Sequence, residues 1–314
     1  MTPSNAFPMI ADAVQMALRG KPAAVRLALT CLFAGGHLLI EDVPGVGKTT
    51  LAKAIANALG GRWQRIQFTP DLLPADITGT SVYDQRTGAF DFRPGPIFSH
   101  LVLADEINRA SPKTQSALLE VMEERQVTVD GRTYPVPKPF LVIATQNPVD
   151  LEGTYRLPEA QLDRFLMRIS IGYPQPAAER EILLSRVATA IATVPKVCDV
   201  DHVVAMVKHI ETIHVAPAIA DYITAITNAT RQREELRLGA SPRASLALLR
   251  AAQAWAVCEG RAYVVPDDVK TVAEPVLAHR LLLTSEAELH RVKPQRLLAE
   301  ILGTVGVPVE SPAR

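Results

Sequence analysis

Residues 38–59, LLIEDVPGVGKTTLAKAIANAL, decide the fold, because they place a glycine-rich loop between an apolar run and a helical pattern. The apolar run His37–Ile40 is predicted to form a strand. From Leu51 to Leu59 apolar residues recur every four positions, which predicts a helix that Gly60 ends. In a strand, loop and helix of this order, loop N–H groups and the positive end of the helix dipole converge on an anion. The stretch therefore predicts a phosphate-binding loop.

The predicted loop and the first turn of its helix supply the candidate nucleotide-binding residues, which are Pro44, Gly45, Val46, Gly47, Lys48, Thr49 and Thr50. Lys48 would reach the β- and γ-phosphates, and the Thr49 hydroxyl would bind Mg²⁺. The full pattern GxxxxGK[ST] requires glycine at a position where this chain has Asp42. Because the shorter GxGKT also arises by chance, the loop alone leaves nucleotide binding open.

A pair of carboxylates follows a buried strand that is predicted over Leu101–Ala104. Asp105 and Glu106 would lie at the carboxyl edge of a parallel sheet, where α/β folds bind their ligands. Asp105 suits the Mg²⁺ shell, and Glu106 suits orienting and deprotonating a water molecule. A strand that simply ends in a polar turn is the alternative. Together with the loop, however, the pair indicates an ATPase that uses ATP and Mg²⁺.

Asn147 follows a third buried strand, predicted over Phe140–Ala144, at the same edge of the sheet. Its amide could hold the attacking water or an oxygen of the γ-phosphate. Asn-Pro is also a common turn-forming dipeptide, so the residues alone leave both interpretations open.

The domain organisation follows from the alternation of patterns along the chain. Apolar strands alternate with helical patterns in the first half, which predicts an α/β domain whose parallel sheet is covered on both faces. Two hairpins are predicted to interrupt this domain, over residues 79–93 and 127–136. From residue 177 onward helical patterns dominate. The predicted domains are therefore a nucleotide-binding core over 1–175 and a helical domain over 176–314.

Local signals mark smaller elements. The second hairpin is predicted to turn at Asp130-Gly131. Ser111 and Ser241 each precede a proline, and each is predicted to cap the N-terminus of a helix. The run Glu123-Glu124-Arg125 is interpreted as a solvated helix end.

The composition is that of a packed globular protein, with 314 residues, 48% of them hydrophobic and 21% charged. Lys+Arg and Asp+Glu number 33 each, and this zero net charge argues against a broad basic face for nucleic acid. Cys31, Cys198 and Cys258 lack the spacing of a disulfide framework or a zinc site, and fit a reducing compartment. The longest uncharged stretch, 27–40, is shorter than the ~18 residues of a membrane span. We therefore expect a cytoplasmic protein without a membrane span.

Five blocks of this sequence, taken in order, resemble the MoxR family of AAA+ ATPases: GHLLIEDVPGVGKTTLAKAIA (36–56), FTPDLLPADITG (68–79), LADEINRASPKTQSALLEVMEERQVTVDG (103–131), FLVIATQNPVDLEGTYRLPEAQLDRFLM (140–167) and GASPRA (239–244). The blocks cover most of residues 36–168, and a thinner match continues through VLAHRLLLTSEAE (276–288). In that family an acidic residue stands where this chain has Asp42, which accounts for the missing glycine.

The resemblance implies a fold and an assembly. MoxR-type proteins have a five-stranded AAA+ P-loop core followed by a small all-helical lid, and they form homo-oligomeric rings, usually hexamers, with nucleotide between neighbours. By similarity, Asn147 is the sensor-1 residue, Arg164 is the arginine finger that reaches the neighbour's nucleotide, and Arg243 is sensor 2 in the lid. The two hairpins would be the helix-2 insert and the pre-sensor-1 insert.

Two positions carry a second interpretation. Without the family, Arg164 would be expected to form a surface ion pair with Asp163 or Glu159. Arg156 stands where the family usually has proline, and we interpret it as a neutral exposed charge.

The leading functional hypothesis is an ATP-driven remodelling chaperone that hydrolyses ATP to ADP and phosphate. The resemblance implies that it matures or activates a partner protein, often one with a von Willebrand factor A domain. A nucleic-acid motor and a magnesium-chelatase motor subunit are the alternatives. The hairpin tips offer only Arg86 beside Asp84 and Arg132 beside Asp130, which argues against nucleic acid. A scaffold without activity is disfavoured because the whole set of candidate catalytic residues is present.

Overall fold

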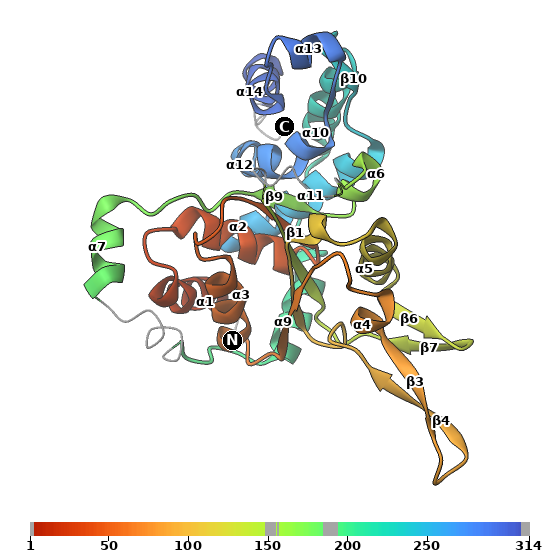
Figure 1. Ribbon diagram of the computed structural model, residues 1–314. Coiled ribbons are helices and arrows are strands. Elements are labelled where there is room, and N and C mark those ends of the chain that lie inside the picture. The colour runs from red at the N-terminus through yellow and green to blue at the C-terminus, as the bar shows by residue number, and fades with distance from the viewer. Residues whose placement is uncertain (1–2, 148–154, 156, 185–193, 309–314) are drawn as a thin grey trace.

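The computed structural model of the chain describes residues 3–147, 155, 157–184 and 194–308 (Figure 1). At its centre lies the expected parallel five-stranded sheet, and its strand order is β2-β5-β8-β1-β9. The strands are β1 (Leu38–Glu41), β2 (Trp63–Gln67), β5 (Leu101–Asp105), β8 (Leu141–Gln146) and β9 (Met167–Ile169).

Helices cover both faces of this sheet. Alternate residues of a strand point to opposite faces, so Leu38 and Ile40 of β1 pack with one set of helices and Leu39 with the other. The first set consists of α1 (Pro3–Ala17), α2 (Pro22–Phe33) and α3 (Lys48–Ala58). The second consists of α4 (Pro74–Thr78) and α5 (Pro112–Glu124). Each face of the sheet therefore has its own hydrophobic core.

Both predicted hairpins are present and extend from the same side of the core (Figure 1). The first joins β3 (Gly79–Asp84) to β4 (Ala89–Pro94), and the second joins β6 (Gln126–Val129) to β7 (Arg132–Pro135). The second turns at Asp130-Gly131, where both residues have positive φ, as a tight hairpin turn requires. The rings of Phe92 and Tyr134 stack with centroids 4.1 Å apart, which links the two hairpins.

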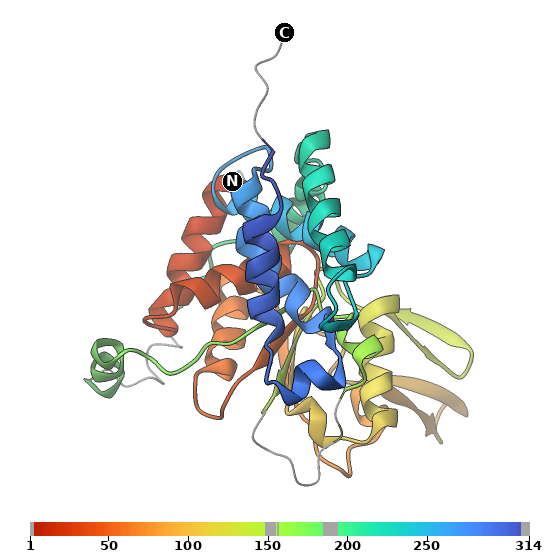
Figure 2. The same cartoon turned by 90° about the horizontal axis from the view of Figure 1, so that it is seen from above.

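The rest of the described chain is mainly helical (Figure 2). The helices are α6 (Glu159–Leu162), α7 (Pro176–Leu184), α9 (Val200–Ile210), α10 (Pro217–Arg231), α11 (Pro242–Cys258), α12 (Pro266–Leu277), α13 (Ser285–Leu289) and α14 (Pro294–Thr304). Short 3₁₀ turns occupy Ile107–Arg109 and Ala278–Arg280. The predicted caps are confirmed, since the hydroxyls of Ser111 and Ser241 accept hydrogen bonds from the N–H groups of Thr114 and Ala244.

The C-terminal part is not helical throughout, which corrects the prediction of an all-helical lid. β10 (Leu236–Leu238) pairs antiparallel with β11 (Leu282–Leu283). The two strands come from segments far apart in the sequence, so neither has a hairpin signal of its own. The core beneath α1, α2 and α3 continues without interruption into α11 and α12. The division at residue 175 stays a prediction.

Two expectations from composition can be compared with the described residues. No helix among them is long and apolar enough to cross a membrane. All three cysteines are buried and free, as the absence of disulfide spacing predicted.

Candidate nucleotide site

The phosphate-binding loop lies between β1 and the N-terminus of α3. Gly45 and Gly47 have φ angles of 84° and 102°, in the left-handed region that residues with a Cβ atom rarely adopt. A Cβ atom on Gly47 would also lie 2.7 Å from Cδ1 of Leu18. The loop therefore needs glycine at the residue that precedes the helix, and it presents the N–H groups of the first turn to the space above.

Asp42 explains how this loop can do without its first glycine. Its Oδ1 accepts a hydrogen bond from the Val43 N–H at 2.9 Å. Its Oδ2 accepts three, from the Ser170 hydroxyl at 2.9 Å and the N–H groups of Ile171 at 2.7 Å and Gly172 at 2.6 Å. Burial raises the pKa of the carboxyl, but the four hydrogen bonds outweigh it and the net pKa is lowered. Asp42 thus ties the start of the loop to the segment that follows β9.

A cavity of about 350 Å³ collects most of the predicted nucleotide-site residues. It is lined by Pro44, Gly45, Gly47, Lys48, Thr49, Thr50, Arg65, Asp105, Glu106 and Asn147. Lys48 lies along the loop, with Nζ donating to the backbone oxygen of Asp42 at 2.8 Å. Val46 does not line the cavity, because its side chain is buried in the core. The ends of β1, β5 and β8 therefore meet the loop at one edge of the sheet, as parallel strands should.

The two carboxylates at the end of β5 are held by neighbouring strands. Asp105 Oδ1 accepts from the Thr145 hydroxyl at 2.7 Å, and Oδ2 accepts from Nε and Nη2 of Arg65 at 3.0 and 2.6 Å. The Glu106 N–H donates to the same Thr145 oxygen at 2.8 Å. Glu106 Oε2 accepts from Gln67 Nε2 at 2.9 Å. Glu106 adopts left-handed angles, φ 57° and ψ 50°, so the chain turns sharply here and presents its side chain at the sheet edge.

The donor set fits Mg²⁺ that arrives with a nucleotide. The hydroxyl of Thr49 and the carboxylate of Asp105 face one cavity, and both are the oxygen ligands that Mg²⁺ prefers. Among the described residues no group of three or more His, Cys, Asp or Glu side chains could hold a metal ion alone. Mg²⁺ in phosphate-transfer sites takes few protein ligands and completes its shell with phosphate and water.

Asn147 stands directly after β8, and its side chain is buried at the wall of the same cavity. The role of its amide stays a prediction.

Arg164 and Arg243 lie elsewhere, in a second cavity that shares no residue with the nucleotide cavity. Both contact Glu123 at the end of α5, Arg164 through Nε at 2.8 Å and Arg243 through Nη1 at 3.2 Å. Asp163 joins this cluster, 3.6 Å from Arg243 Nε and 2.6 Å from Arg280 Nε. The ion pair expected of Arg164 is therefore present, but its partner is Glu123 and not Asp163 or Glu159.

The interpretation of residues 123–125 as a solvated helix end is wrong for Arg125, whereas Glu123 is exposed as expected and also forms ion pairs. Glu123 binds both arginines, and Arg125 is directed inward, donating to the backbone oxygen of Phe140 and, at 2.7 Å, to that of Gly35. Burial lowers the pKa of Arg125. The fold brings the end of α2 and the start of β8 against the end of α5, which the local sequence does not reveal. Glu124, like Glu123, is exposed.

Comparisons with known proteins agree with this geometry. The profile of the ATPase family associated with various cellular activities (AAA) matches residues 37–167, and that of an AAA lid domain matches 228–301. A Bacillus subtilis protein, YeaC, is 47% identical, with 98% of this chain and 97% of that protein covered. Chaperone MoxR1 from Mycobacterium tuberculosis is 44% identical, with 94% of this chain and 80% of that protein covered.

This chain belongs to the MoxR family of AAA+ ATPases. A solved structure of similar fold, from a Cytophaga hutchinsonii protein that carries an ATPase assignment, has a TM-score of 0.90 and 38% identity. It covers 98% of this chain and 96% of that chain. As a MoxR-family member the protein is a nucleotide-binding ATPase, and the AAA match spans the loop, both carboxylates and Asn147.

The MoxR-family site contains residues that sequence reasoning missed. Arg65 and Gln67 lie two positions apart on β2 and so share a face, and Gln67 is in register with Asp105. Thr145, one position before the end of β8, joins the two carboxylates. Polar residues at the ends of strands were the available signal; it identified Asp105, Glu106 and Asn147, but it was not applied to β2 or to Thr145. Arg156, the departure from the family pattern, lies outside the described residues.

Proposed function

We propose that this MoxR-family protein hydrolyses ATP to ADP and phosphate, with Mg²⁺, in a homo-oligomeric ring, and uses the cycle to remodel a partner protein in the cytoplasm. The proposal rests on one observation: the residues of the nucleotide cavity and the two predicted catalytic arginines lie in different cavities of the same copy. Lys48, Thr49, Glu106 and Asn147 face one cavity, whereas Arg164 and Arg243 face another. A complete catalytic set therefore requires a second copy, and a ring, most simply a hexamer, supplies one at every seam.

Within one copy the cavity residues divide the chemistry. Lys48 would bind the β- and γ-phosphates, with the N–H groups at the start of α3. Thr49 and Asp105 would hold Mg²⁺, which neutralises phosphate charge when bound. Glu106 would accept a proton from the attacking water, and Asn147 would orient that water or a γ-phosphate oxygen.

The neighbouring copy would supply Arg164 and Arg243. An arginine delivered in trans stabilises charge on the transferring phosphoryl group and is worth roughly 10³–10⁵ in rate. Both arginines lie close enough to share one carboxylate, so one movement of the neighbour would deliver them together. Hydrolysis would then depend on assembly, and assembly on nucleotide.

A protein is the partner class that the surface favours. The related MoxR1 is named a chaperone. The first hairpin exposes Tyr83 and Phe90, whose ring centroids lie 5.3 Å apart, and an exposed apolar pair suits a protein surface. A partner with a von Willebrand factor A domain is our specific proposal, with both hairpins as contact sites. The balanced charge of the chain argues against a nucleic-acid motor.

Mixing subunits tests the shared site. Arg164→Ala and Lys48→Ala proteins should each be inactive alone. In mixed rings some seams pair the intact loop of an Arg164→Ala copy with the intact arginine of a Lys48→Ala copy, so turnover should return. If co-assembled mixtures, verified by crosslinking, stay inactive, the arginine does not act in trans.

Affinity capture tests the partner. Glu106→Gln protein held in ATP should retain its partner, because it binds nucleotide without turnover. We expect recovery of a specific protein that depends on ATP and resists nuclease. Recovery of nucleic acid alone, weakening steeply with salt, would contradict the chaperone proposal.

A further inference from the structure

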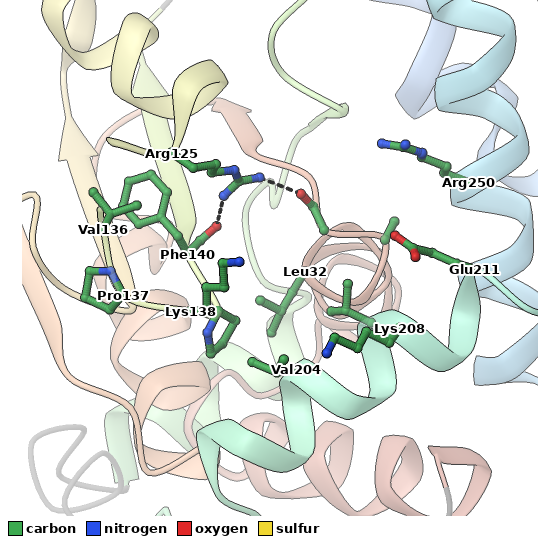
Figure 3. A pocket seen from close by; sticks show the side chains of 14 residues that line it. Leu32, Arg125, Val136, Pro137, Lys138, Phe140, Val204, Lys208, Glu211 and Arg250 are labelled. Atoms are coloured by element: carbon green, nitrogen blue, oxygen red, sulfur yellow. Dashed lines mark hydrogen bonds between the residues drawn. The ribbon is translucent and has the colours of Figure 1, made fainter. Parts of the chain in front are cut away.

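A separate cavity of about 280 Å³ lies on the core, away from the nucleotide cavity, with which it shares no residue (Figure 3). Its walls are the end of α2, the connection from β7 to β8, and α9. These three elements meet beside Arg125, whose guanidinium is fixed by the backbone oxygens of Phe140 and Gly35. The cavity therefore has a rigid wall on the side of the core.

The interior of this cavity is apolar. Leu32 from α2, Val136 and Phe140 from the β7–β8 connection, and Val204 from α9 supply side chains that pack against it. Leu32, Val136 and Phe140 are at most 6% exposed, so they form a floor and not an outer surface. A small apolar side chain placed here would be well covered.

The rim of the cavity is strongly cationic. Lys138, Lys208 and Arg250 line it with Arg125, against the single acid Glu211. In Figure 3 Lys138 and Lys208 come from different elements and lie on either side of Leu32. Over the described ranges of the chain, no carboxylate lies within the 4.0 Å of an ion pair with either lysine or with Arg250. A chain of zero net charge thus concentrates unpaired positive charge at one apolar cavity.

We propose that this cavity binds an acidic segment of the partner protein through one or two apolar side chains. The inference rests on the proposed function, in which the ATPase acts on a protein. The apolar floor would contact an apolar side chain of the segment, and the cationic residues at the rim would form ion pairs with the carboxylates on either side of it. The volume lies just below the ~300–1,000 Å³ that encloses a small organic ligand, and Lys138, Lys208 and Arg250 are exposed. A peptide segment lying across an open rim fits this shape better than an enclosed small molecule.

The cavity lies next to Arg164 and Arg243, so a segment bound in it could affect these two arginines. Arg250 lines both this cavity and the cavity that contains Arg164 and Arg243. Arg125 lies two residues after Glu123, the carboxylate that holds both of those arginines. A bound acidic segment would thus lie next to the residues that the neighbouring nucleotide requires.

Fluorescence anisotropy with a labelled peptide, Asp-Glu-Leu-Phe-Asp-Glu, tests the site in the full chain without nucleotide. The double variant Lys138→Glu/Lys208→Glu should weaken binding about tenfold, since two exposed ion pairs, each worth up to about fivefold in affinity, are lost. The matched control Lys113→Glu/Lys293→Glu makes the same charge change at exposed positions outside the cavity, and should change the affinity less than twofold. A peptide with Ser-Ser in place of Leu-Phe should also bind at least tenfold more weakly.

Several results would overturn the inference. These are equal weakening by both double variants, equal binding of the Ser-Ser peptide, displacement by an oligonucleotide of equal charge, and no binding of the acidic peptide at all. A loss of ring assembly in Lys138→Glu/Lys208→Glu, with peptide affinity unchanged, would assign the face to a second copy of the chain. The peptide measurement needs no ATP, so its failure beside normal ATP turnover would leave the proposed function standing. Peptide binding by a ring that does not hydrolyse ATP would support the binding site and contradict the proposed function.

Discussion

The guanidinium groups of Arg164 and Arg243 share one carboxylate, that of Glu123, with Arg164 on Oε2 at 2.8 Å and Arg243 on Oε1 at 3.2 Å. The hydrogen bond from Arg164 is the main reason that the pKa of Glu123 is lowered. Glu123 therefore stays ionised at neutral pH. If the two arginines act on a neighbour's nucleotide, they must exchange this carboxylate for phosphate oxygens, so Glu123 sets how readily they are released.

Glu123→Gln is expected to raise ATP turnover of the assembled protein by about two- to fivefold. Each exposed pair contributes up to about 1 kcal/mol, and the variant removes the charge while keeping an acceptor oxygen. Steady-state turnover at saturating ATP measures the effect, and it should shrink at high salt. Glu120→Gln, an exposed carboxyl one turn earlier on α5, is the control. A tenfold fall in turnover would instead show that Glu123 orients the arginines productively.

Asp42→Ala is expected to lower the free energy of unfolding by about 2–4 kcal/mol. It leaves the N–H groups of Ile171 and Gly172 without their acceptor. Asp42→Asn should cost about half as much, because one amide oxygen can still accept from the segment after β9. Urea unfolding of the two variants measures both values. Unchanged stability in Asp42→Ala would mean that the carboxylate does not anchor the loop.

Thr145→Val is expected to lower the turnover number by about 10–100-fold with little change in ATP affinity. The hydroxyl donates to Asp105 and accepts from the Glu106 N–H, so valine of equal shape removes both contacts and lets Glu106 shift. Thr145→Ser keeps the hydroxyl and should restore most of the activity. Equal loss in the serine and valine variants would mean that the hydroxyl alone does not hold Glu106 in place at this buried position.

Local signals predicted most of the fold. Apolar runs located β1, β5 and β8, Asp130-Gly131 located a turn, and serine before proline located the starts of α5 and α11. The nucleotide cavity was predictable because parallel strands must end at one edge, which brings Lys48 and Asp105 together. The resemblance to the MoxR family supplied the candidates Arg164 and Arg243.

Contacts between distant segments were not predictable. Glu123 is 41 residues from Arg164 and 120 from Arg243, and no spacing rule connects them. Asp42 looked like a departure from a motif, and only the fold shows that its partners lie 128–130 residues later. The strands β10 and β11 are too short to carry a period. In each case the residue that makes the contact lies in another element, so the local sequence pattern cannot predict the contact.

His37 should make the stability of the protein depend on pH below about 6.5. The Val142 N–H donates to its Nδ1 at 3.0 Å, and its Nε2 lies 3.0 Å from the Met122 oxygen, to which it must donate. The ring is therefore neutral. Burial, helped by the charge of Arg125, lowers its pKa well below the ordinary value of 6.5.

The unfolded chain then binds a proton at His37 that the folded chain does not, so this contribution to stability is present above pH 6.5 and is lost as the pH falls. The loss of free energy of unfolding reaches about 1.4 kcal/mol per pH unit.

Urea unfolding at pH 7.5, 6.5 and 5.5 measures how steeply the free energy of unfolding depends on pH. His37→Gln has no titrating ring, so it should be less stable at pH 7.5 but lose less between pH 6.5 and 5.5. His279, which is also buried with a lowered pKa, contributes equally to both proteins, so the difference between their slopes isolates His37. Parallel slopes would mean that His37 becomes protonated inside the folded protein.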